Sequence, residues 1–472
     1  MAISLLNSPA VRRRAPLLRG ALLASFALEL FFLTFGRGAL GPYVSPIVLL
    51  LSGVALSWLT WRCVPAAAAA DEPAPVPVPD PVPKPAGRAA GRPDWRWWAL
   101  VIGSTIGWIC WEAPRLKKLF DRYSPPSSDV LPLIHGYVRR WRWGDVVYQD
   151  FHSEIGYYVA PTYYPATWFP FVLADVARFD YRWLAFAGLL GGVVAYWVTL
   201  SRRAEPPGEL LAKALLPLLV ASVTRAYIGD AYGVTAEPLI AGYYLLLGAS
   251  LLSRSVPLRA VAITLCLLSR WSLLIWLPFY FLLVWRQEGA RRGLTIGALV
   301  GALVLGCYVW PFLRHDWTVP GRALAYYALA GAGEWQLNAD HLRLNQAFSG
   351  VGLAPFFHPS KTDGQPIVAA AVVAAIDTLK RVQVVALLVL LCGLAGWWWR
   401  RGRAVAAGMA RSLELHRPAP DQLFALVSLK AYLAVFFATI LVPYVYLLLV
   451  SIFLSVLLVG QVRFTSRPSL AT

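Results

Sequence analysis

Long apolar segments separated by short polar connections dominate the chain. An α-helix of about 20 mostly apolar residues crosses a hydrocarbon layer of about 30 Å, and most of the segments approach that length. They can be drawn at residues 17–36, 43–61, 96–113, 183–200, 209–225, 235–251, 258–269, 271–286, 292–312, 382–399, 421–441 and 444–460. The pattern predicts an all-α, polytopic membrane protein with about 12 transmembrane helices, in a range of about 11 to 13.

Two long polar stretches interrupt this pattern. They cover residues 114–182 and 313–381, and alternation of the helices places both on the same side of the membrane, which gives the protein a large first outer loop. The first contains one apolar run, ATWFPFVLADVAR at 166–178, which is too short to span the membrane comfortably. We expect it to form a helix at the membrane interface.

A linker rich in proline and alanine divides the chain. Residues 63–94 have no periodic apolar face, and such a composition favours an extended, semi-rigid tether. We therefore expect an N-terminal transmembrane hairpin at 1–62, a cytoplasmic linker at 63–94, a main transmembrane body at 95–462 and a cytoplasmic tail at 463–472.

Charge gives the orientation. The chain is 58% hydrophobic and 14% charged with a formal net charge of +18, and its basic residues are spread over the ends of the apolar segments. A nucleic-acid partner requires a basic patch or stripe, so none is expected. Lys and Arg favour the cytoplasmic side, and Arg12, Arg13 and Arg14 place the N-terminus there. This predicts a multi-pass protein of the cell membrane, in contact with membrane lipid. The 21 tryptophans often stand beside arginine, as at membrane interfaces.

The five cysteines do not suggest a disulfide framework or a metal site. They lie in or beside apolar runs without close spacing: Cys63, Cys110, Cys266, Cys307 and Cys392. No cofactor is expected, and the need for a divalent metal ion stays open.

Polar residues on the predicted outer side carry a resemblance. The first outer loop contains Asp129, Tyr137, the run Gly144, Asp145 and Tyr148, and the pair Tyr164 and Pro165. Further along come Gly229 with Asp230, Arg270 with Pro278, the run Asn345, Gln346 and Ala347, and Pro443. This order resembles the integral-membrane glycosyltransferases of the GT-C superfamily, in particular the bacterial branch that takes mannose or a related sugar from a polyprenyl-phosphate carrier. The chain departs from that pattern at Asp230, where Gln is usual, and at Ala347, where Ser is usual.

The resemblance implies an inverting transfer of a hexose or pentose to a glycan, lipid or protein acceptor at the extracytoplasmic face. A carboxylate must then take the acceptor's proton and cations must meet the leaving phosphate. We expect Asp129 to be the general base, and Arg225 and Arg270 to bind the donor phosphate. Further candidates for substrate binding are Tyr137, Asp145, Tyr148, Tyr164, Asp230, Asn345 and Gln346.

Each candidate also has a structural interpretation. Asp129 follows SPPSS and is placed to cap a helix, and arginines at helix ends often extend to lipid headgroups. Asp145 and Asp150 could pair with loop arginines, and the tyrosines could pack at the interface. Lys430, inside an apolar segment, could meet a structural partner or a substrate. The rival functions are a lipid or polysaccharide transporter (flippase) and an inactive GT-C-like scaffold.

Overall fold

A computed structural model of the protein describes residues 9–70, 95–123, 128–152, 158–203, 205–336, 346–359, 369–412 and 419–465. These residues are helical except for turns, loops and one antiparallel pair of two-residue strands, β1 (Phe151–His152) and β2 (Tyr158–Val159). The prediction of a helical membrane protein is confirmed at this level.

The helices of the bundle follow the predicted apolar segments. They are α2 (Pro9–Leu33), α3 (Gly41–Ala70), α4 (Trp95–Arg122), α8 (Tyr181–Leu200), α9 (Pro207–Tyr227), α11 (Glu237–Leu251), α12 (Val256–Leu267), α13 (Trp276–Glu288), α14 (Ala290–Val304), α17 (Ala369–Ser412), α18 (Pro420–Ala438) and α19 (Leu449–Gln461). Shorter elements connect them: α5 (Val130–Trp143), α6 (Pro165–Trp168), α7 (Phe171–Val176), α10 (Gly229–Gly233), η2 (Trp271–Leu273), η3 (Leu305–Val309), α15 (Trp310–Phe312), η4 (Leu313–His315), α16 (Val319–Gln336), η6 (Gln346–Phe348), η7 (Ala354–Phe356) and η8 (Val445–Leu448).

Seven helices in the described part of the chain are long and apolar enough to cross a membrane. They cover Ala15–Leu33, Gly41–Val64, Tyr181–Leu200, Pro207–Tyr227, Ala290–His315, Ala370–Arg400 and Pro420–Ala438. Of the other predicted spans, α4 is long but carries Glu112 and several basic residues, whereas α11 has 15 residues and α13 has 13. The full set of about 12 spans therefore stays a prediction. The apolar run at 166–178 is split between α6 and α7, and both helices are far shorter than a span.

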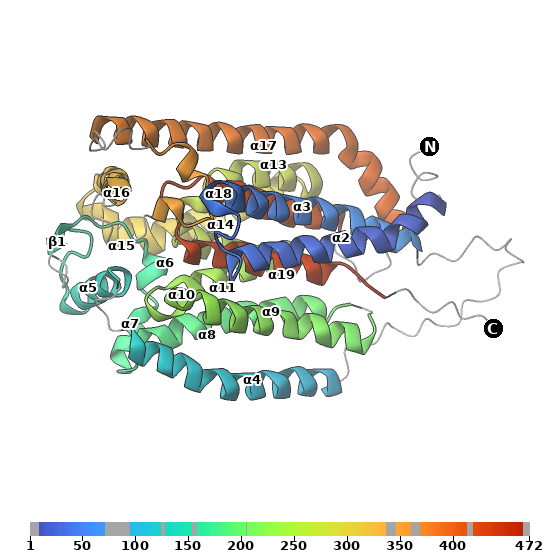
Figure 1. Ribbon diagram of the computed structural model, residues 1–472, viewed down its shortest axis with the longest axis horizontal. Helices are drawn as coiled ribbons and strands as arrows, with labels where there is room; N and C mark the ends of the chain where they lie inside the picture. Colours follow the sequence, from blue (N-terminus) through green and yellow to red (C-terminus); the bar gives the residue numbers. More distant parts are fainter. Residues whose placement is uncertain are drawn as a thin grey trace, which may run out of the picture.

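Helices α11, α18 and α19 form the centre of the bundle. Every residue of α19 is buried, while α4 and α17 lie on opposite outer sides (Figure 1). Small residues allow α8 and α11 to approach closely: a Cβ built on Gly192 of α8 would lie 2.5 Å from the carbonyl oxygen of Gly242 in α11. Such contacts are typical of helices that associate in lipid, where close packing replaces the hydrophobic driving force.

The N-terminal hairpin belongs to this bundle. Helix α3 packs against α18 and α19, and α2 packs against α3 and α19. Side chains of α2, α3, α18 and α19 share one hydrophobic core. Helix α3 also extends to Ala70, so the first residues of the predicted linker are helical; residues 71–94 of that linker lie outside the described residues. The hairpin is thus connected to the body by side-chain packing as well as by the linker.

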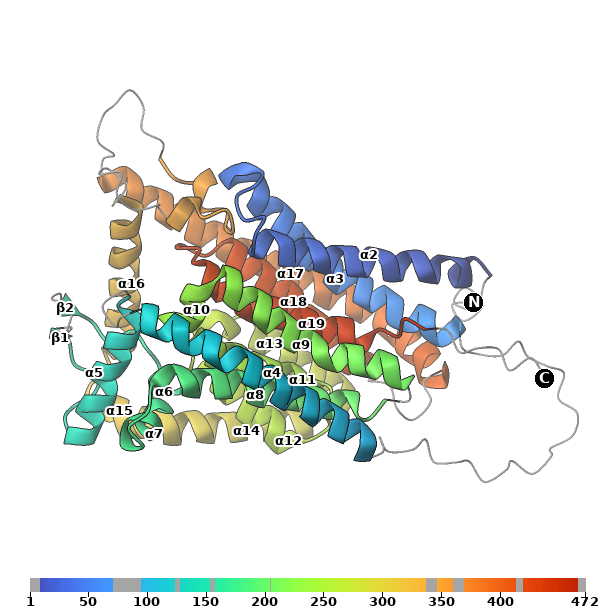
Figure 2. The same ribbon diagram turned by 60° about the horizontal axis from the view of Figure 1, so that its bottom comes forward.

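The two ends of the bundle differ. At one end, Arg19 of α2 donates to the carbonyl oxygen of Phe464 at 2.9 Å, and Arg203 after α8 donates to that of Gly460 at 2.6 Å. The opposite end carries α5, α6, α7, β1, α15 and α16 (Figures 1 and 2). Residues from both long loops therefore meet at one end of the molecule.

Candidate active site

Asp129 directly precedes α5. The preceding Ser128 accepts a hydrogen bond from the backbone N–H of Val130 at 3.3 Å, whereas Asp129 makes no side-chain capping bond. Its carboxylate is close enough to act electrostatically on the hydroxyl groups of Tyr163 and Tyr444. Burial, and then the charge of Asp129, raise the pKa of Tyr163, so this tyrosine stays protonated. The structure thus shows no side-chain cap from Asp129 on α5.

Arg270 lies in the turn between α12 and η2. Its guanidinium forms an ion pair with Glu237 at the start of α11, and its side chain is 18% exposed. One guanidinium nitrogen, Nη1, is buried without a hydrogen-bond partner among the described residues. Burial lowers the pKa of Arg270 to about 10, although Tyr446, Tyr163 and Tyr327 oppose that shift. Arg270 therefore carries a cation with one unsatisfied donor.

Asp129 and Arg270 act on the same tyrosine. The hydroxyl of Tyr163 lies in electrostatic range of both residues. The same holds for Tyr446, which lies in η8, directly before α19. The two charged residues come from elements that are far apart in the sequence. Thr167 of the first long loop donates to the carbonyl oxygen of Ser269, the neighbour of Arg270, at 3.0 Å, so the fold joins the loop that contains Asp129 to the turn that contains Arg270.

Tyr137 and Tyr148 hold the segment that carries Tyr163. The hydroxyl of Tyr137 accepts from the backbone N–H of Thr162 at 3.0 Å. The hydroxyl of Tyr148 donates to the carbonyl oxygen of Tyr163 at 2.9 Å and accepts from the indole N–H of Trp168 at 3.0 Å. Both side chains are buried, and burial raises the pKa of both hydroxyls. Tyr137 and Tyr148 thus hold the backbone of residues 162 and 163 in place. Their role in binding substrate stays a prediction.

Arg225 and Asp230 are engaged elsewhere. Arg225 pairs with Glu112 of α4 at 2.7 Å, and Ser222 donates to the same carboxylate at 2.7 Å. Asp230 accepts a hydrogen bond from Tyr123 at 2.6 Å. These contacts connect α4 with α9 and α10, so they give both residues structural partners. Arg270 is the stronger candidate for a phosphate.

The remaining predicted site residues are spread over the loops. Tyr164 is partly buried, and its ring packs edge-on against Trp271 and Tyr308, with centroids 5.5 Å and 5.3 Å away. Asp145 is exposed beyond the end of α5. Asn345 lies outside the described residues, and only the backbone of Gln346, at the start of η6, is described.

An ion pair connects the two long loops. Asp150, before β1, pairs with Arg322 of α16 at 3.0 Å, and Arg322 also pairs with Asp316 at 2.7 Å. Asp150 was expected to pair with an arginine, and it does, although that arginine belongs to the second loop. In the part of the chain that the structure describes, no group of three or more His, Cys, Asp or Glu side chains could hold a metal ion.

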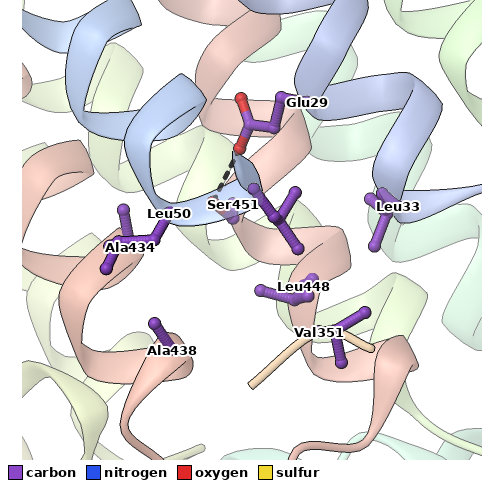
Figure 3. Close-up of a pocket in the computed structure, with 9 residues that line it drawn as sticks. Glu29, Leu33, Leu50, Val351, Ala434, Ala438, Leu448 and Ser451 are labelled. Atoms are coloured by element: carbon purple, nitrogen blue, oxygen red, sulfur yellow. Dashed lines mark hydrogen bonds between the residues drawn. The ribbon is translucent and has the colours of Figure 1, made fainter. Parts of the chain in front are cut away.

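Lys430 has a partner in the N-terminal hairpin. Its ammonium pairs with Glu29 of α2 and donates to the hydroxyl of Ser451 at 2.6 Å. Ser451 and Ser455 of α19 donate to Glu29 at 3.1 Å and 2.6 Å. Figure 3 shows Glu29 and Ser451 at a small pocket whose other lining side chains, such as Leu448, are apolar. The structural partner left open by the sequence is Glu29.

Several residues of this end were missed by the sequence reasoning. They are Tyr326, Tyr327, Glu334, Tyr444 and Tyr446. Tyr444 and Tyr446 flank the apolar Val445 directly after Pro443, and an aromatic pair in an outer turn was the available signal. Glu334 gave no signal, since the sequence placed it in a long polar stretch, where a single glutamate is usually a solvated surface residue.

No known family model, curated protein or solved structure matches this chain. Its function is therefore inferred from its own residues.

Proposed function

We propose that this protein is an inverting glycosyltransferase, similar to the GT-C superfamily, which transfers a sugar from a polyprenyl-phosphate carrier to an acceptor. The observation that carries the proposal is the contact between the first long loop and the turn that holds Arg270, where Thr167 donates to the carbonyl oxygen of Ser269 at 3.0 Å. Tyr163 of that loop is in electrostatic range of both Asp129 and Arg270. A transferase of this kind needs a base for the acceptor and a cation for the leaving phosphate within one substrate's length of each other.

The reaction divides the work between these two residues. The oxygen of an acceptor hydroxyl attacks the anomeric carbon while the bond from that carbon to the phosphate oxygen breaks. Asp129 takes the hydroxyl proton, and polyprenyl phosphate leaves with the bonding electrons. Arg270 meets its negative charge, since guanidinium can donate parallel hydrogen bonds to phosphate oxygens. Attack opposite the leaving group inverts the anomeric configuration.

Glu237 is the counter-ion of Arg270 in the resting protein. A buried arginine without a counter-ion would be costly, and the ion pair with Glu237 offsets that cost in the resting protein. The unsatisfied Nη1 of Arg270 is a donor distinct from Nη2, which pairs with Glu237, but it is buried in the resting protein, so a phosphate must open the site to reach it. Arg225 is less suited to this role because its partner Glu112 also accepts a hydrogen bond from Ser222, which makes the pair part of the contact between α4 and α9.

The proposed orientation places the site on the extracytoplasmic face of the cell membrane. Arg19, Arg203 and Arg463 lie at the end of the bundle opposite the long loops, where the sequence predicts the cytoplasm. We further propose that all 12 apolar segments cross the membrane, the shorter helices being extended by the turns that follow them. The donor's lipid would then reach the site from the outer leaflet.

The test is transfer of radiolabelled sugar from polyprenyl-phosphate mannose, and then from the glucose and arabinose analogues, into membrane lipids and glycans. Asp129→Asn should reduce transfer by about 100-fold or more, the usual contribution of a positioned base. Asp121→Asn is the matched control, because Asp121 lies on α4 with its side chain 64% exposed and should leave transfer unchanged.

Both variants must be produced in amounts equal to the wild type for the comparison to hold. Equal transfer by the wild type and Asp129→Asn would remove Asp129 from the mechanism. No transfer from any donor, in membranes where a known transferase works, would favour a transporter or an inactive scaffold instead.

A further inference from the structure

Two parallel tyrosines lie beside the proposed base. The rings of Tyr444 and Tyr446 stack with centroids 5.0 Å apart and an interplanar angle of 9°, and both side chains are partly exposed. The hydroxyl of Tyr444 donates to a carboxylate oxygen of Glu334 in α16 at 3.1 Å. The group therefore combines aromatic faces with a carboxylate, and two separate segments contribute to it.

This group is in electrostatic range of Asp129. The charges of Glu334 and Asp129 both act on the hydroxyl of Tyr444, and those of Asp129 and Arg270 act on Tyr446. Both tyrosines are thus in electrostatic range of Asp129, and Tyr446 is also in electrostatic range of Arg270. An acceptor held here would have a hydroxyl within reach of Asp129.

The group is also held firmly. The indole N–H of Trp335, the neighbour of Glu334, donates to the carbonyl oxygen of Leu441 at 2.9 Å. Ser349 donates to the carbonyl oxygen of Pro443 at 2.9 Å. These bonds fix the end of α16 and the loop before η7 to the turn that leads into Tyr444. A binding group needs such support to keep its geometry.

Its chemistry suits a sugar ring. Tyrosine offers a flat apolar face with a polar edge, and the C–H face of a pyranose packs on such a surface. An ionised carboxylate only accepts hydrogen bonds and has about four lone-pair positions. On Glu334, the hydroxyl of Tyr444 occupies one of them. The remaining positions can accept from sugar hydroxyls, which are donors.

We infer that Tyr444, Tyr446 and Glu334 form the binding subsite for a carbohydrate acceptor. The acceptor role rests on the proposed glycosyltransferase function, and the inference narrows the acceptor to a glycan or glycolipid. A simple lipid alcohol or a serine side chain has no ring face for the tyrosines to contact. Glu334 acts as a positioning residue, since Asp129 takes the proton.

Binding is measured first, on the purified full-length protein in lipid nanodiscs. The probe is tritiated octyl α-mannopyranoside, with octyl glucoside and octyl galactoside as further probes and 1-octanol as the same tail without a ring. We expect saturable binding of at least one glycoside and none of octanol. Glu334→Gln and Tyr444→Leu should each weaken it about tenfold, which is about 1.4 kcal/mol. Tyr227→Leu is the control, because Tyr227 is exposed at the end of α9.

Transfer kinetics then separate the acceptor from the donor. With the glycoside as acceptor, Glu334→Gln and Tyr444→Leu should raise its KM about tenfold and leave the KM of the donor unchanged. A purely structural role would lower expression or change both KM values together. Two results overturn the inference. Either glycoside binding does not saturate at any probe concentration, or both variants bind the glycoside as tightly as the wild type does.

The outcomes also distinguish the two proposals. Transfer to a non-carbohydrate acceptor without glycoside binding would leave the glycosyltransferase standing and overturn the subsite. Glycoside binding that depends on Glu334 and Tyr444, in a protein that transfers no sugar, would support the subsite and refute the transferase.

Discussion

The ion pair between Lys430 and Glu29 should be the most sensitive point of the bundle. Neither side chain is more than 3% exposed, and the pair connects α18 with α2 across the interior. Removal of one member leaves a buried charge without its counter-ion, which typically costs about 3–5 kcal/mol. Replacement of both members removes the pair and both desolvation penalties, and often costs little. The hydroxyls of Ser451 and Ser455 would still satisfy an amide at position 29.

We therefore expect Lys430→Met to destabilise the protein by about 3–5 kcal/mol, and the double variant Glu29→Gln with Lys430→Met to be clearly more stable than the sum of the single changes predicts. The assay is equilibrium unfolding by SDS titration in mixed micelles, followed by tryptophan fluorescence. The matched control is Lys117→Met, which breaks the ion pair with Asp121 on the surface of α4, where both side chains are more than 60% exposed. An exposed pair of this spacing contributes about 0.3–0.5 kcal/mol.

Two results would refute this reasoning. If Lys430→Met costs no more than Lys117→Met, the buried pair does not hold α2 to α18. If the double variant equals the sum of its single variants, Lys430 and Glu29 do not interact in the folded protein.

Two smaller predictions concern backbone strain and pH. Gly350 has φ +82°, and an added Cβ would lie 2.9 Å from the backbone nitrogen of Gly38. Gly350→Ala should therefore lower the free energy of unfolding by at least about 1–2 kcal/mol. Gly393→Ala, in open space on α17, should raise it by about 0.5–1 kcal/mol in the same unfolding assay. Burial raises the pKa of Asp180, but hydrogen bonds from Arg182 outweigh it and lower that pKa overall, so the stabilisation from this carboxylate is present above about pH 4 and lost in acid. Asp180→Asn should therefore be less stable than the wild type at neutral pH, with the difference vanishing as pH falls below 3.8; a constant difference would contradict this.

Some residues of the candidate site could be proposed from their order along the chain, and others could not. Asp129 and Arg270 were proposed from their order along the chain, and the structure brings them to one tyrosine. Arg225 was proposed on the same grounds, yet Glu112 engages it. Both arginines pair with a glutamate, Arg270 with Glu237 and Arg225 with Glu112, and order along the chain does not reveal that Arg270 also keeps a buried nitrogen without a partner. This difference depends on which helices pack together.

The sequence by itself determined the helices and their alternation. Each apolar segment becomes a helix because its backbone must satisfy its own hydrogen bonds once water is excluded, and that requirement acts on about 20 neighbouring residues at a time. Arginines at the ends of apolar segments are equally local signals. Arg19 and Arg203 lie at the same end of the bundle, as this pattern indicates.

Only the tertiary structure decided which polar groups meet. Lys430 pairs with Glu29 across 401 residues, and Tyr444 reaches Glu334 across 110. Such pairs form because an ionisable or hydroxyl group inside the bundle must find a partner there, and the partner is fixed by helix packing. Helix formation depends on local composition, whereas the pairing of these groups depends on contacts between distant segments, and no local pattern in the sequence records them.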